Sequence, residues 1–190
     1  MNKLSNFAPF FILIFLVGII GISTYKINAK QQVKQEDLSK NIEGVTTNLF
    51  SKEDILLPEF SLPDLYDATK DFSNKDLLGK YSIINFFASW CTTCHAEHKA
   101  LMRLKQEGIV DIYGVAWRDI NDNTKAYLEK NGNPFTKIAT DNKAIFSKIT
   151  GIKAVPETLI VDSNGKVIFK YQGNLEEFAI DEIRRVVVKK

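Results

Sequence analysis

The sequence predicts an α/β domain, with a central mixed sheet flanked by helices, preceded by one N-terminal transmembrane helix. Short apolar runs rich in β-branched and aromatic residues alternate with stretches whose apolar residues recur at helical spacing, which indicates the α/β class. Both cysteines of the 190-residue chain lie where one such run meets a helix. A long uncharged segment near the amino terminus indicates the transmembrane helix.

The composition fits one ordinary domain and an additional segment. The chain is 45% hydrophobic and carries a formal net charge of +2, so no basic surface for nucleic acid is predicted. The two cysteines allow no other disulfide within one chain, and they are too few to predict a zinc site. We therefore expect no metal and no cofactor beyond what the cysteine pair itself provides.

The amino-terminal segment predicts a membrane anchor. Residues 7–22 contain no charged side chain, and the next three residues extend the span to residue 25. A helix over residues 7–25 measures about 28 Å, enough to cross the bilayer core. Residues 27–29 match a cleavage site poorly, so we favour an uncleaved signal-anchor over residues 1–25 rather than a removed signal peptide.

A polar tether is expected to follow the anchor. Residues 26–56 are rich in Lys, Gln, Glu and Asn and contain few large apolar side chains. The folded domain is predicted to occupy residues 57–190. It begins with an extended edge segment at Pro58–Pro63 and a short helix capped at Ser73.

The central strand leads directly to the cysteines. Residues 81–88 form an apolar run, broken only by Asn85, which is typical of a strand buried on both faces. Cys91 and Cys94 follow at once, and helical periodicity then continues to Gly108. The pair is therefore expected at the N-terminus of a helix.

This placement favours thiol chemistry. Unpaired N–H groups and the helix dipole stabilise a thiolate, and the thiolate is the nucleophile in disulfide exchange. An ordinary thiol with a pKa of about 8.5 is only roughly 3% ionised at pH 7. Cys91, at the helix edge, is predicted to be the attacking thiol. Cys94, one turn further, is predicted to be the shielded resolving thiol.

The same residues allow a second interpretation. Cys91, Cys94 and His95 spell C-x-x-C-H, the attachment pattern of c-type haem, with His95 as an axial ligand. A buried strand entering the motif is not needed for haem attachment, and Met102 lies too near on the same helix to be the second ligand. A haem-binding electron-transfer protein, with His98 or an outside ligand, therefore stays as an alternative.

The rest of the chain continues the α/β pattern. The prediction has a strand at 110–116 parallel to the central strand, a helix at 119–131, a turn at 133–135 and a helix capped by Asp141. A hairpin over residues 157–172 and a final helix from residue 175 follow. The order βαβα(α)ββα around a redox cysteine pair describes a thioredoxin-like fold.

Several stretches resemble one family within the thioredoxin superfamily. They are Trp90–Cys94, Glu97-His98, Gly114–Asp119 with Gly132–Phe135, and Val155–Thr158 running into residues 159–162. Together they resemble the DsbE/CcmG family, the membrane-anchored thiol:disulfide proteins of cytochrome c maturation. Thr92 and Thr93 depart from relatives that have proline inside the cysteine pair, and His95 stands where relatives often have Arg or Lys.

The resemblance implies a protein disulfide reductase. It implies apocytochrome c or another disulfide-bearing exported protein as partner, a membrane electron donor that re-reduces the pair, and a cis Pro156 that leaves Val155 free to pair with an extended substrate. A general periplasmic oxidant or isomerase is the alternative, because the sequence does not fix the direction of electron flow.

The domain is assigned to the periplasmic side of a bacterial inner membrane, with a single span. Lys26, Lys30 and Lys34 come after the span, and the positive-inside rule opposes this orientation. We assign it nevertheless, because a signal-like span exports the domain that comes after it and an isolated redox pair suits that compartment.

A proton acceptor for the resolving thiol is also expected. Asn85 stands where thioredoxins resemble one another in having a buried acid, and an amide takes no proton at neutral pH. Glu97 or Glu157 would then supply the base, with a solvated surface acid as the alternative for each.

Other side chains near the cysteines have less specific predictions. Trp90 is expected to cover the disulfide, or to be a core residue. His95 is expected to modulate thiolate charge, or simply to lie exposed, and His98 is expected at the surface. Trp117 and the Gly132–Phe135 turn are candidates to shape a substrate groove, although turn chemistry alone explains the glycine and proline.

Overall fold

A computed structural model describes residues 21–22, 24–32, 34 and 50–188. It divides into two units, Met1–Asn48 and Leu49–Lys190, which are described separately. In the first unit the described residues are helical. Among the described residues, no helix is both long enough and apolar enough to cross a bilayer. Most of the predicted span at residues 7–25 lies outside them.

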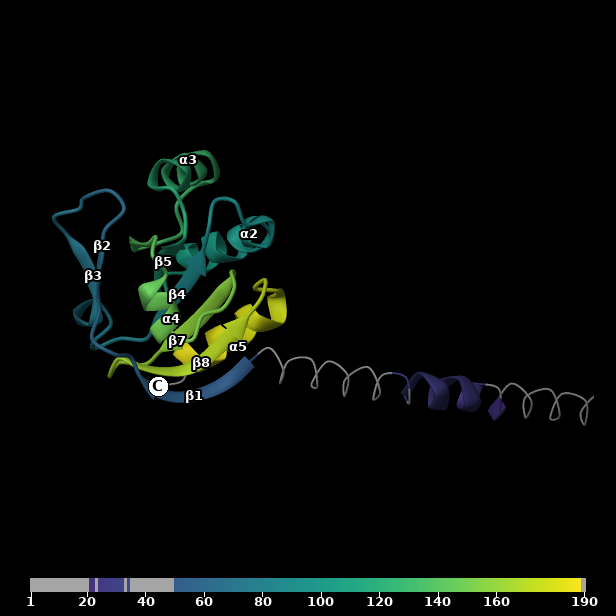
Figure 1. The fold of residues 1–190 in the computed structure, drawn as a ribbon. Coiled ribbons are helices and arrows are strands. Elements are labelled where there is room, and N and C mark those ends of the chain that lie inside the picture. The colour runs from purple at the N-terminus through teal and green to yellow at the C-terminus, as the bar shows by residue number, and fades with distance from the viewer. Residues whose placement is uncertain (1–20, 23, 33, 35–49, 189–190) are drawn as a thin grey trace, which may run out of the picture. The chain divides into compact units, whose positions relative to one another are not determined.

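The second unit is built on a mixed sheet in which the described residues form six strands (Figure 1). The strand order is β1 (Phe50–Leu56), β8 (Lys166–Gln172), β7 (Glu157–Val161), β4 (Ser82–Phe87), β5 (Asp111–Trp117) and β6 (Lys137–Asp141). Strand β4 is parallel to β5 and antiparallel to β7. The helices are α2 (Thr92–Glu107), α3 (Asn121–Asn131), α4 (Ile145–Ile149) and α5 (Glu177–Val188).

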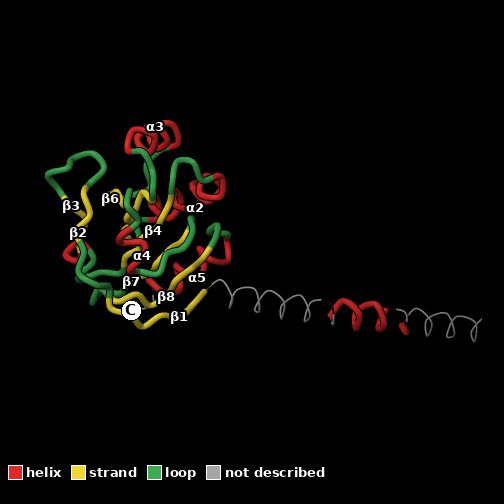
Figure 2. Tube along the Cα trace, in the orientation of Figure 1, coloured by secondary structure: helices red, strands yellow, loops and turns green. Residues whose placement is uncertain are grey.

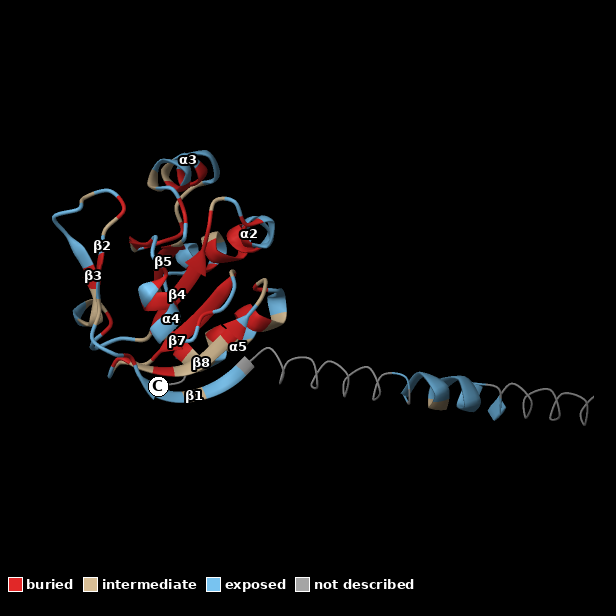
Figure 3. Cartoon of the chain, in the orientation of Figure 1, coloured by how far each residue is buried: buried red, intermediate tan, exposed pale blue. Residues whose placement is uncertain are grey.

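Alternating side chains of β4 pack into two hydrophobic clusters, one on each face of the sheet. Ile83 and Phe87 belong to the cluster that contains the buried residues of α2, α3 and α5. Ile84 and Phe86 belong to the cluster with α4 and a small two-stranded sheet. Every residue of β4 is buried, as predicted, and the burial colours show β4 and β7 inside the molecule (Figure 3). Figure 2 shows the helices and strands in the same view.

The helix after the cysteines has the predicted ends. Cys91 is the N-cap residue of α2, and its side chain accepts a hydrogen bond from the Cys94 N–H. Gly108 ends the helix with φ 65°, a left-handed conformation that glycine adopts without a Cβ clash. The carboxyl end of β4 thus delivers the cysteine pair to a helix N-terminus.

Most of the later elements are confirmed. Strand β5 is parallel to β4, α3 ends at Asn131, and β7 and β8 form an antiparallel pair. The Asp141 carboxylate accepts N–H bonds from Ile145 and Ser147 at 2.9 and 2.8 Å, and so caps α4 as expected.

Strand β6 was not predicted. Its sequence, KIATD, is short and contains Ile138 as its one large apolar residue. It forms because β5 offers it a parallel partner, with Tyr113 opposite Lys137 and Trp117 opposite Asp141. Sequence patterning does not reveal such pairing.

The predicted boundary between tether and domain requires correction. The tether was predicted over residues 26–56, but Phe50–Leu56 is strand β1, paired antiparallel with β8. Most side chains of residues 51–56 are exposed, so the strand has the polar composition of a tether. Backbone hydrogen bonds to β8, which composition does not reflect, add it to the sheet.

The segment before β4 is partly as predicted. Within the extended Pro58–Pro63 stretch, β2 (Ser61–Pro63) pairs with β3 (Asp71–Ser73) in a separate two-stranded sheet. A 3-10 helix, η2 (Asn74–Asp76), follows with a capping box, in which the Ser73 N–H donates to Asp76 Oδ2 at 3.0 Å.

Candidate active site

Cys91 and Cys94 form a disulfide at the N-terminus of α2, with 5.3 Å between their Cα atoms. The Cys94 N–H points at Cys91 Sγ, with 3.1 Å between N and S. This N–H belongs to the first turn of the helix and has no partner within it. It stabilises negative charge on Cys91 Sγ when the disulfide is reduced, as expected for an attacking thiol.

Burial does not separate the two cysteines. Cys91 is 5% exposed and Cys94 is 3% exposed, so the expected contrast between an accessible and a shielded sulfur is absent in the disulfide form. The difference between them lies in their polar neighbours. Cys91 Sγ receives the helix N–H and lies 3.6 Å from the Val155 carbonyl oxygen.

The Val155–Pro156 peptide bond is cis, as the resemblance implied. It lies immediately before β7, and the Val155 carbonyl faces Cys91. The structure therefore brings together residues 64 positions apart in the sequence, and places the bend before β7 beside the sulfur.

Glu97 is a buried acid, not a solvated one. It is 1% exposed, and its carboxylate accepts bonds from Asn85 Nδ2 at 2.9 Å and from the Leu175 N–H at 3.1 Å. Burial raises the pKa of Glu97 to about 7, and these two hydrogen bonds oppose the rise. Glu97 lies one helical turn after Cys94. Its raised pKa and its position on α2 keep Glu97 as a candidate for the expected proton acceptor.

Asn85 supports this acid. Its Nδ2 donates to Glu97 and also to Thr158 Oγ1, at 3.0 Å, on the neighbouring strand β7. The polar exception in the central strand thus has a role in the structure: it donates a hydrogen bond to the buried carboxylate of Glu97.

Glu157 is also buried, at 2% exposed, so the surface interpretation is wrong for both acids. Its carboxylate forms an ion pair with Lys170 at 2.8 Å and accepts a bond from Gln172 Nε2 at 3.2 Å. Both partners lie on β8, whose register brings Gln172 opposite Glu157. The charge of Glu157 is therefore compensated, which distinguishes it from Glu97.

Trp90 lies on the surface beside the cysteines. It is 57% exposed, so the core interpretation is wrong. Its Nε1–H donates to the Arg118 carbonyl at 3.3 Å, and its ring centroid lies 6.0 Å from that of Trp117. The Arg118 guanidinium in turn stacks over Trp117 at 5.1 Å. The covering of the disulfide by Trp90 stays a prediction.

The groove candidate at residues 132–135 packs into the core. Phe135 is buried, and its ring stacks on Phe87 with centroids 4.7 Å apart. The same ring lies against Gly114, where a Cβ atom would come within 2.8 Å of Phe135 Cγ. This contact links the Gly114 and Gly132–Phe135 stretches, which are far apart in the sequence.

The two histidines differ from each other. His95 is exposed, as expected, and its Nε2–H donates to the Ser89 carbonyl at 2.8 Å. His98 was expected at the surface, but it is buried between α2 and α3. It bonds the Tyr127 hydroxyl at 2.8 Å and the Asn131 carbonyl at 3.1 Å, and burial lowers its pKa.

Haem attachment would need both cysteine sulfurs and a ring nitrogen of His95, and these atoms already have other partners. Both sulfurs are bonded to each other and buried, and the His95 nitrogen that donates to Ser89 is part of a local turn. The buried strand β4 enters the motif directly. The geometry is that of a disulfide centre.

Sequence patterns did not single out two residues of the site. Lys170 is a lysine in a strand, and the β7–β8 register places it opposite Leu159, two residues along β7 from Glu157, where its side chain forms the ion pair. Asp119 stood out only as the end of a longer stretch. It is 5% exposed, and a carboxylate buried that deeply requires several donors.

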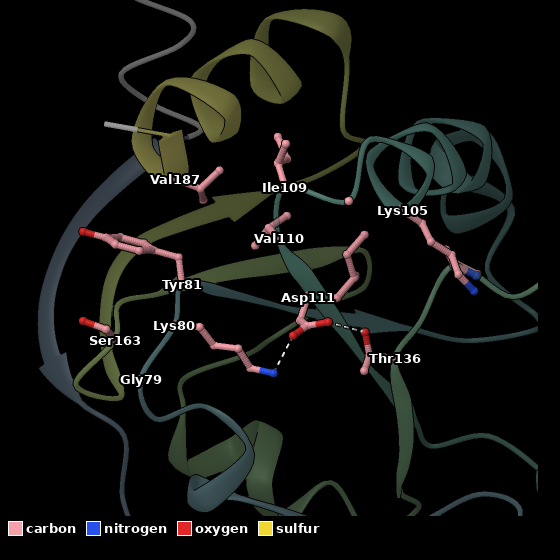
Figure 4. Close-up of a pocket in the computed structure, with 13 residues that line it drawn as sticks. Gly79, Lys80, Tyr81, Lys105, Ile109, Val110, Asp111, Thr136, Ser163 and Val187 are labelled. Carbon is pink, nitrogen blue, oxygen red and sulfur yellow. Dashed lines mark hydrogen bonds and ion pairs between the residues drawn. The ribbon is translucent and has the colours of Figure 1, made fainter. Parts of the chain in front are cut away.

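A separate cavity of about 640 Å³ lies at the other end of the sheet (Figure 4). It is lined near the starts of β4 and β5, whereas the cysteines come after the end of β4. Its polar groups are largely paired: Lys80 forms an ion pair with Asp111, which also accepts a bond from Thr136 at 2.9 Å. The cavity is not part of the disulfide centre.

A cysteine pair at a helix N-terminus, a facing cis-proline and a buried acid, on this sheet, define a thiol:disulfide oxidoreductase of the thioredoxin superfamily. Residues 52–187 match the Redoxin family model. DsbE of Allochromatium vinosum, a thiol:disulfide interchange protein, is 37% identical over 135 residues, which cover 70% of this chain and 74% of that protein.

HelX of Rhodobacter capsulatus, also a thiol:disulfide interchange protein, is 39% identical over 60% of this chain and 64% of its own length. Among solved structures, a thio-disulfide isomerase from Thermus thermophilus shares the fold with a TM-score of 0.60, at 24% identity over 74% of this chain and 99% of that chain. The chain belongs to the Redoxin family and, within it, to the DsbE family of thiol:disulfide interchange proteins.

Proposed function

We propose that this protein reduces disulfides of apocytochrome c during cytochrome c maturation, from the periplasmic side of a bacterial inner membrane. The resemblance to DsbE/CcmG proteins supplies the substrate class and the compartment. The uncharged segment at residues 7–25 supports the proposed membrane anchor. The chemistry rests on one observation: Cys91 Sγ lies between the helix N–H of Cys94 and the carbonyl of Val155.

The reaction proceeds in two exchanges. The Cys91 thiolate attacks one sulfur of the partner's disulfide, which forms a mixed disulfide and releases the partner's other sulfur as a thiolate. Cys94 then loses its proton to Glu97, and its thiolate attacks Cys91 Sγ. The partner's remaining sulfur leaves, and the Cys91–Cys94 disulfide forms.

Two electrons pass from the protein to its partner in each cycle. The oxidised protein is then re-reduced by a membrane electron donor, and no cofactor beyond the cysteine pair takes part. The backbone at Val155 holds the partner as an extended segment during the exchange, with its carbonyl already beside Cys91.

A trapping experiment tests the proposal. Cys94→Ser removes the resolving thiol, so mixed disulfides with the partner accumulate and are identified by mass spectrometry. Cys91→Ser is the matched control and should accumulate none. Capture of apocytochrome c by Cys94→Ser alone supports the proposal, and equal behaviour of the two variants contradicts the assignment of roles.

The direction of electron flow needs its own measurement. Equilibration of the protein with glutathione gives its reduction potential. A reducing value, below that of glutathione, is expected for a reductase of apocytochrome c. A strongly oxidising value would favour the alternative of a general periplasmic oxidant or isomerase.

A further inference from the structure

All three polar groups of Ser89, two residues before Cys91, bond to residues outside its own turn. Its N–H donates to Asp119 Oδ2 at 2.6 Å and its hydroxyl donates to Asp119 Oδ1 at 2.9 Å. Its carbonyl accepts the Nε2–H of His95 at 2.8 Å. One residue of the turn that delivers the nucleophile is therefore held from two sides.

Both holding residues are themselves fixed. Asp119 is buried in the connection between β5 and α3, where its carboxylate also accepts the Ile120 N–H and the Thr124 hydroxyl, each at 2.8 Å. The His95 ring stacks on Tyr127 of α3, with centroids 4.6 Å apart. Both residues that hold Ser89 are thus supported by α3: Thr124 bonds Asp119, and Tyr127 stacks on His95.

We propose that Asp119 and His95 are positioning residues for the nucleophile, which hold Ser89 so that Cys91 Sγ keeps its contact with the Cys94 N–H in the first turn of α2. The inference rests on thiol–disulfide exchange at Cys91. It adds to that reaction a support supplied by α3.

The geometry of the turn explains the effect on Cys91. The Cys91 N–H bonds the Ala88 carbonyl at 3.2 Å, so residues 88–91 form one tight turn with Ser89 inside it. If Ser89 moves, the turn moves with it, and Cys91 Sγ leaves the 3.1 Å contact with the Cys94 N–H. The thiolate then loses a hydrogen bond that favours it over the thiol.

Positioning and simple charge predict opposite results at Asp119. A carboxylate close to a thiol raises the thiol pKa by repulsion, so removing only its charge would lower the pKa of Cys91. Removing a positioning residue instead raises that pKa, because the thiolate loses the helix N–H. The sign of the change therefore distinguishes the two roles.

The experiment measures the rate of alkylation by iodoacetamide against pH in the full-length protein carrying Cys94→Ser, where Cys91 is the single thiol. Asp119→Ala is expected to raise the Cys91 pKa by about one unit, which slows alkylation at neutral pH by roughly tenfold. Asp119→Asn keeps one acceptor oxygen and should give a smaller rise. His95→Phe keeps an aromatic ring on Tyr127, removes the donor, and should also slow alkylation.

Thr124→Val is the matched control. It removes one hydrogen bond to the same carboxylate but leaves the Ile120 bond and both bonds to Ser89 in place, so it should lower the urea midpoint while leaving the alkylation rate within about twofold. A Cys91 pKa that falls or stays unchanged in folded Asp119→Ala overturns the proposal. So does a Thr124→Val effect as large as that of Asp119→Ala.

If Asp119→Ala does not fold, Ser89→Ala and His95→Phe decide the question. Ser89→Ala leaves Asp119 and its contacts with α3 in place, and both variants should raise the Cys91 pKa. Normal alkylation in both overturns the proposal. Alkylation needs no protein partner. The alkylation result therefore does not depend on whether apocytochrome c is trapped by Cys94→Ser.

Discussion

Glu97 combines deep burial with a location one helical turn from the resolving thiol. Its pKa of about 7 means that it exchanges protons near neutral pH, which an acid at its ordinary pKa of 4.5 does not. Glu157, beside the cis-proline, is instead held by Lys170. Of the two acids singled out in the sequence, Glu97 is therefore the one that we propose as the proton acceptor for Cys94.

Replacing Glu97 by Gln should slow the second exchange and flatten its pH dependence. In the unmodified protein the step should accelerate as pH rises through about 7, because ionised Glu97 accepts the proton of Cys94. Stopped-flow measurement of mixed-disulfide resolution gives the profile. Glu157→Gln is the control and should keep the rise, and an unchanged profile in Glu97→Gln would remove the proposed role.

Glu97 should also make stability depend on pH. The pKa of Glu97 is raised from 4.5 to about 7 in the folded protein, so the folded state favours the protonated carboxyl. This contribution to the free energy of unfolding is fully present below about pH 4.5 and is lost as the pH rises through about 7. The shift corresponds to about 3 kcal/mol of unfolding free energy.

Urea unfolding of the oxidised protein measures this dependence at the two ends of the range. As the pH rises from about 4.5 to above 7, the unfolding free energy of the unmodified protein should fall relative to that of Glu97→Gln. A constant difference would contradict a raised pKa.

Lys170 compensates the buried charge of Glu157. The side chains of Lys170 and Glu157 are only 13% and 3% exposed, so Lys170→Met should destabilise the fold by about 3 kcal/mol. Lys166 on the same strand pairs with exposed Asp54, and Lys166→Met should cost less than about 1 kcal/mol.

Urea unfolding of both lysine variants, and of Lys170→Met with Glu157→Gln, tests the role of this ion pair. The double variant should recover part of the loss, because no buried charge is left unpaired. Equal midpoints for Lys170→Met and Lys166→Met would show that the buried pair is unimportant.

At the scale of elements, β5 and the turn before β6 fit together through one glycine. A Cβ atom at Gly114 would meet the Phe135 ring at 2.8 Å, and that ring stacks on Phe87 in β4. Gly114→Ala should therefore destabilise the protein by about 1–3 kcal/mol through overpacking.

Thermal unfolding of Gly114→Ala, Phe135→Leu and the double variant tests this packing. The smaller side chain at residue 135 should tolerate the added methyl, so the double variant should lose less than the sum of the two. Strict additivity would mean that the two residues do not press on each other.

The elements that sequence patterning predicts are those with a local signal. Strand β4 and helix α2 carry continuous apolar or periodic patterns, and a capping cysteine and a terminal glycine mark the helix ends. Strands β1 and β6 carry no such pattern. They exist because β8 and β5 offer backbone partners, and that pairing depends on the folded sheet.

The same limit applies to the site. Cys91 and Cys94 were predicted because their residue type and spacing carry chemistry. Glu97 was predicted as one of two candidate acids, and the cis Pro156 was implied by the resemblance to a known family. Asp119 meets Ser89 across 30 residues, and Lys170 reaches Glu157 diagonally across the paired strands β7 and β8. Contacts between such segments follow from the complete fold.

At the scale of the whole molecule, the sheet brings three distant segments to one place. The end of β4 supplies the cysteines, the connection after β5 supplies Asp119, and the start of β7 supplies Val155 and Pro156. Parallel pairing of β4 with β5 and antiparallel pairing of β4 with β7 make these ends neighbours. The disulfide centre is thus a product of the topology.

Cys91 must be the more reactive of two equally buried sulfurs if it is the nucleophile. The reduced protein, treated with a limiting amount of iodoacetamide and analysed by peptide mass spectrometry, shows which thiol is modified first. We expect label on Cys91 with little on Cys94, because the helix N–H favours the Cys91 thiolate. Label first on Cys94, or equally on both, would contradict the assignment of Cys91 as the attacking thiol.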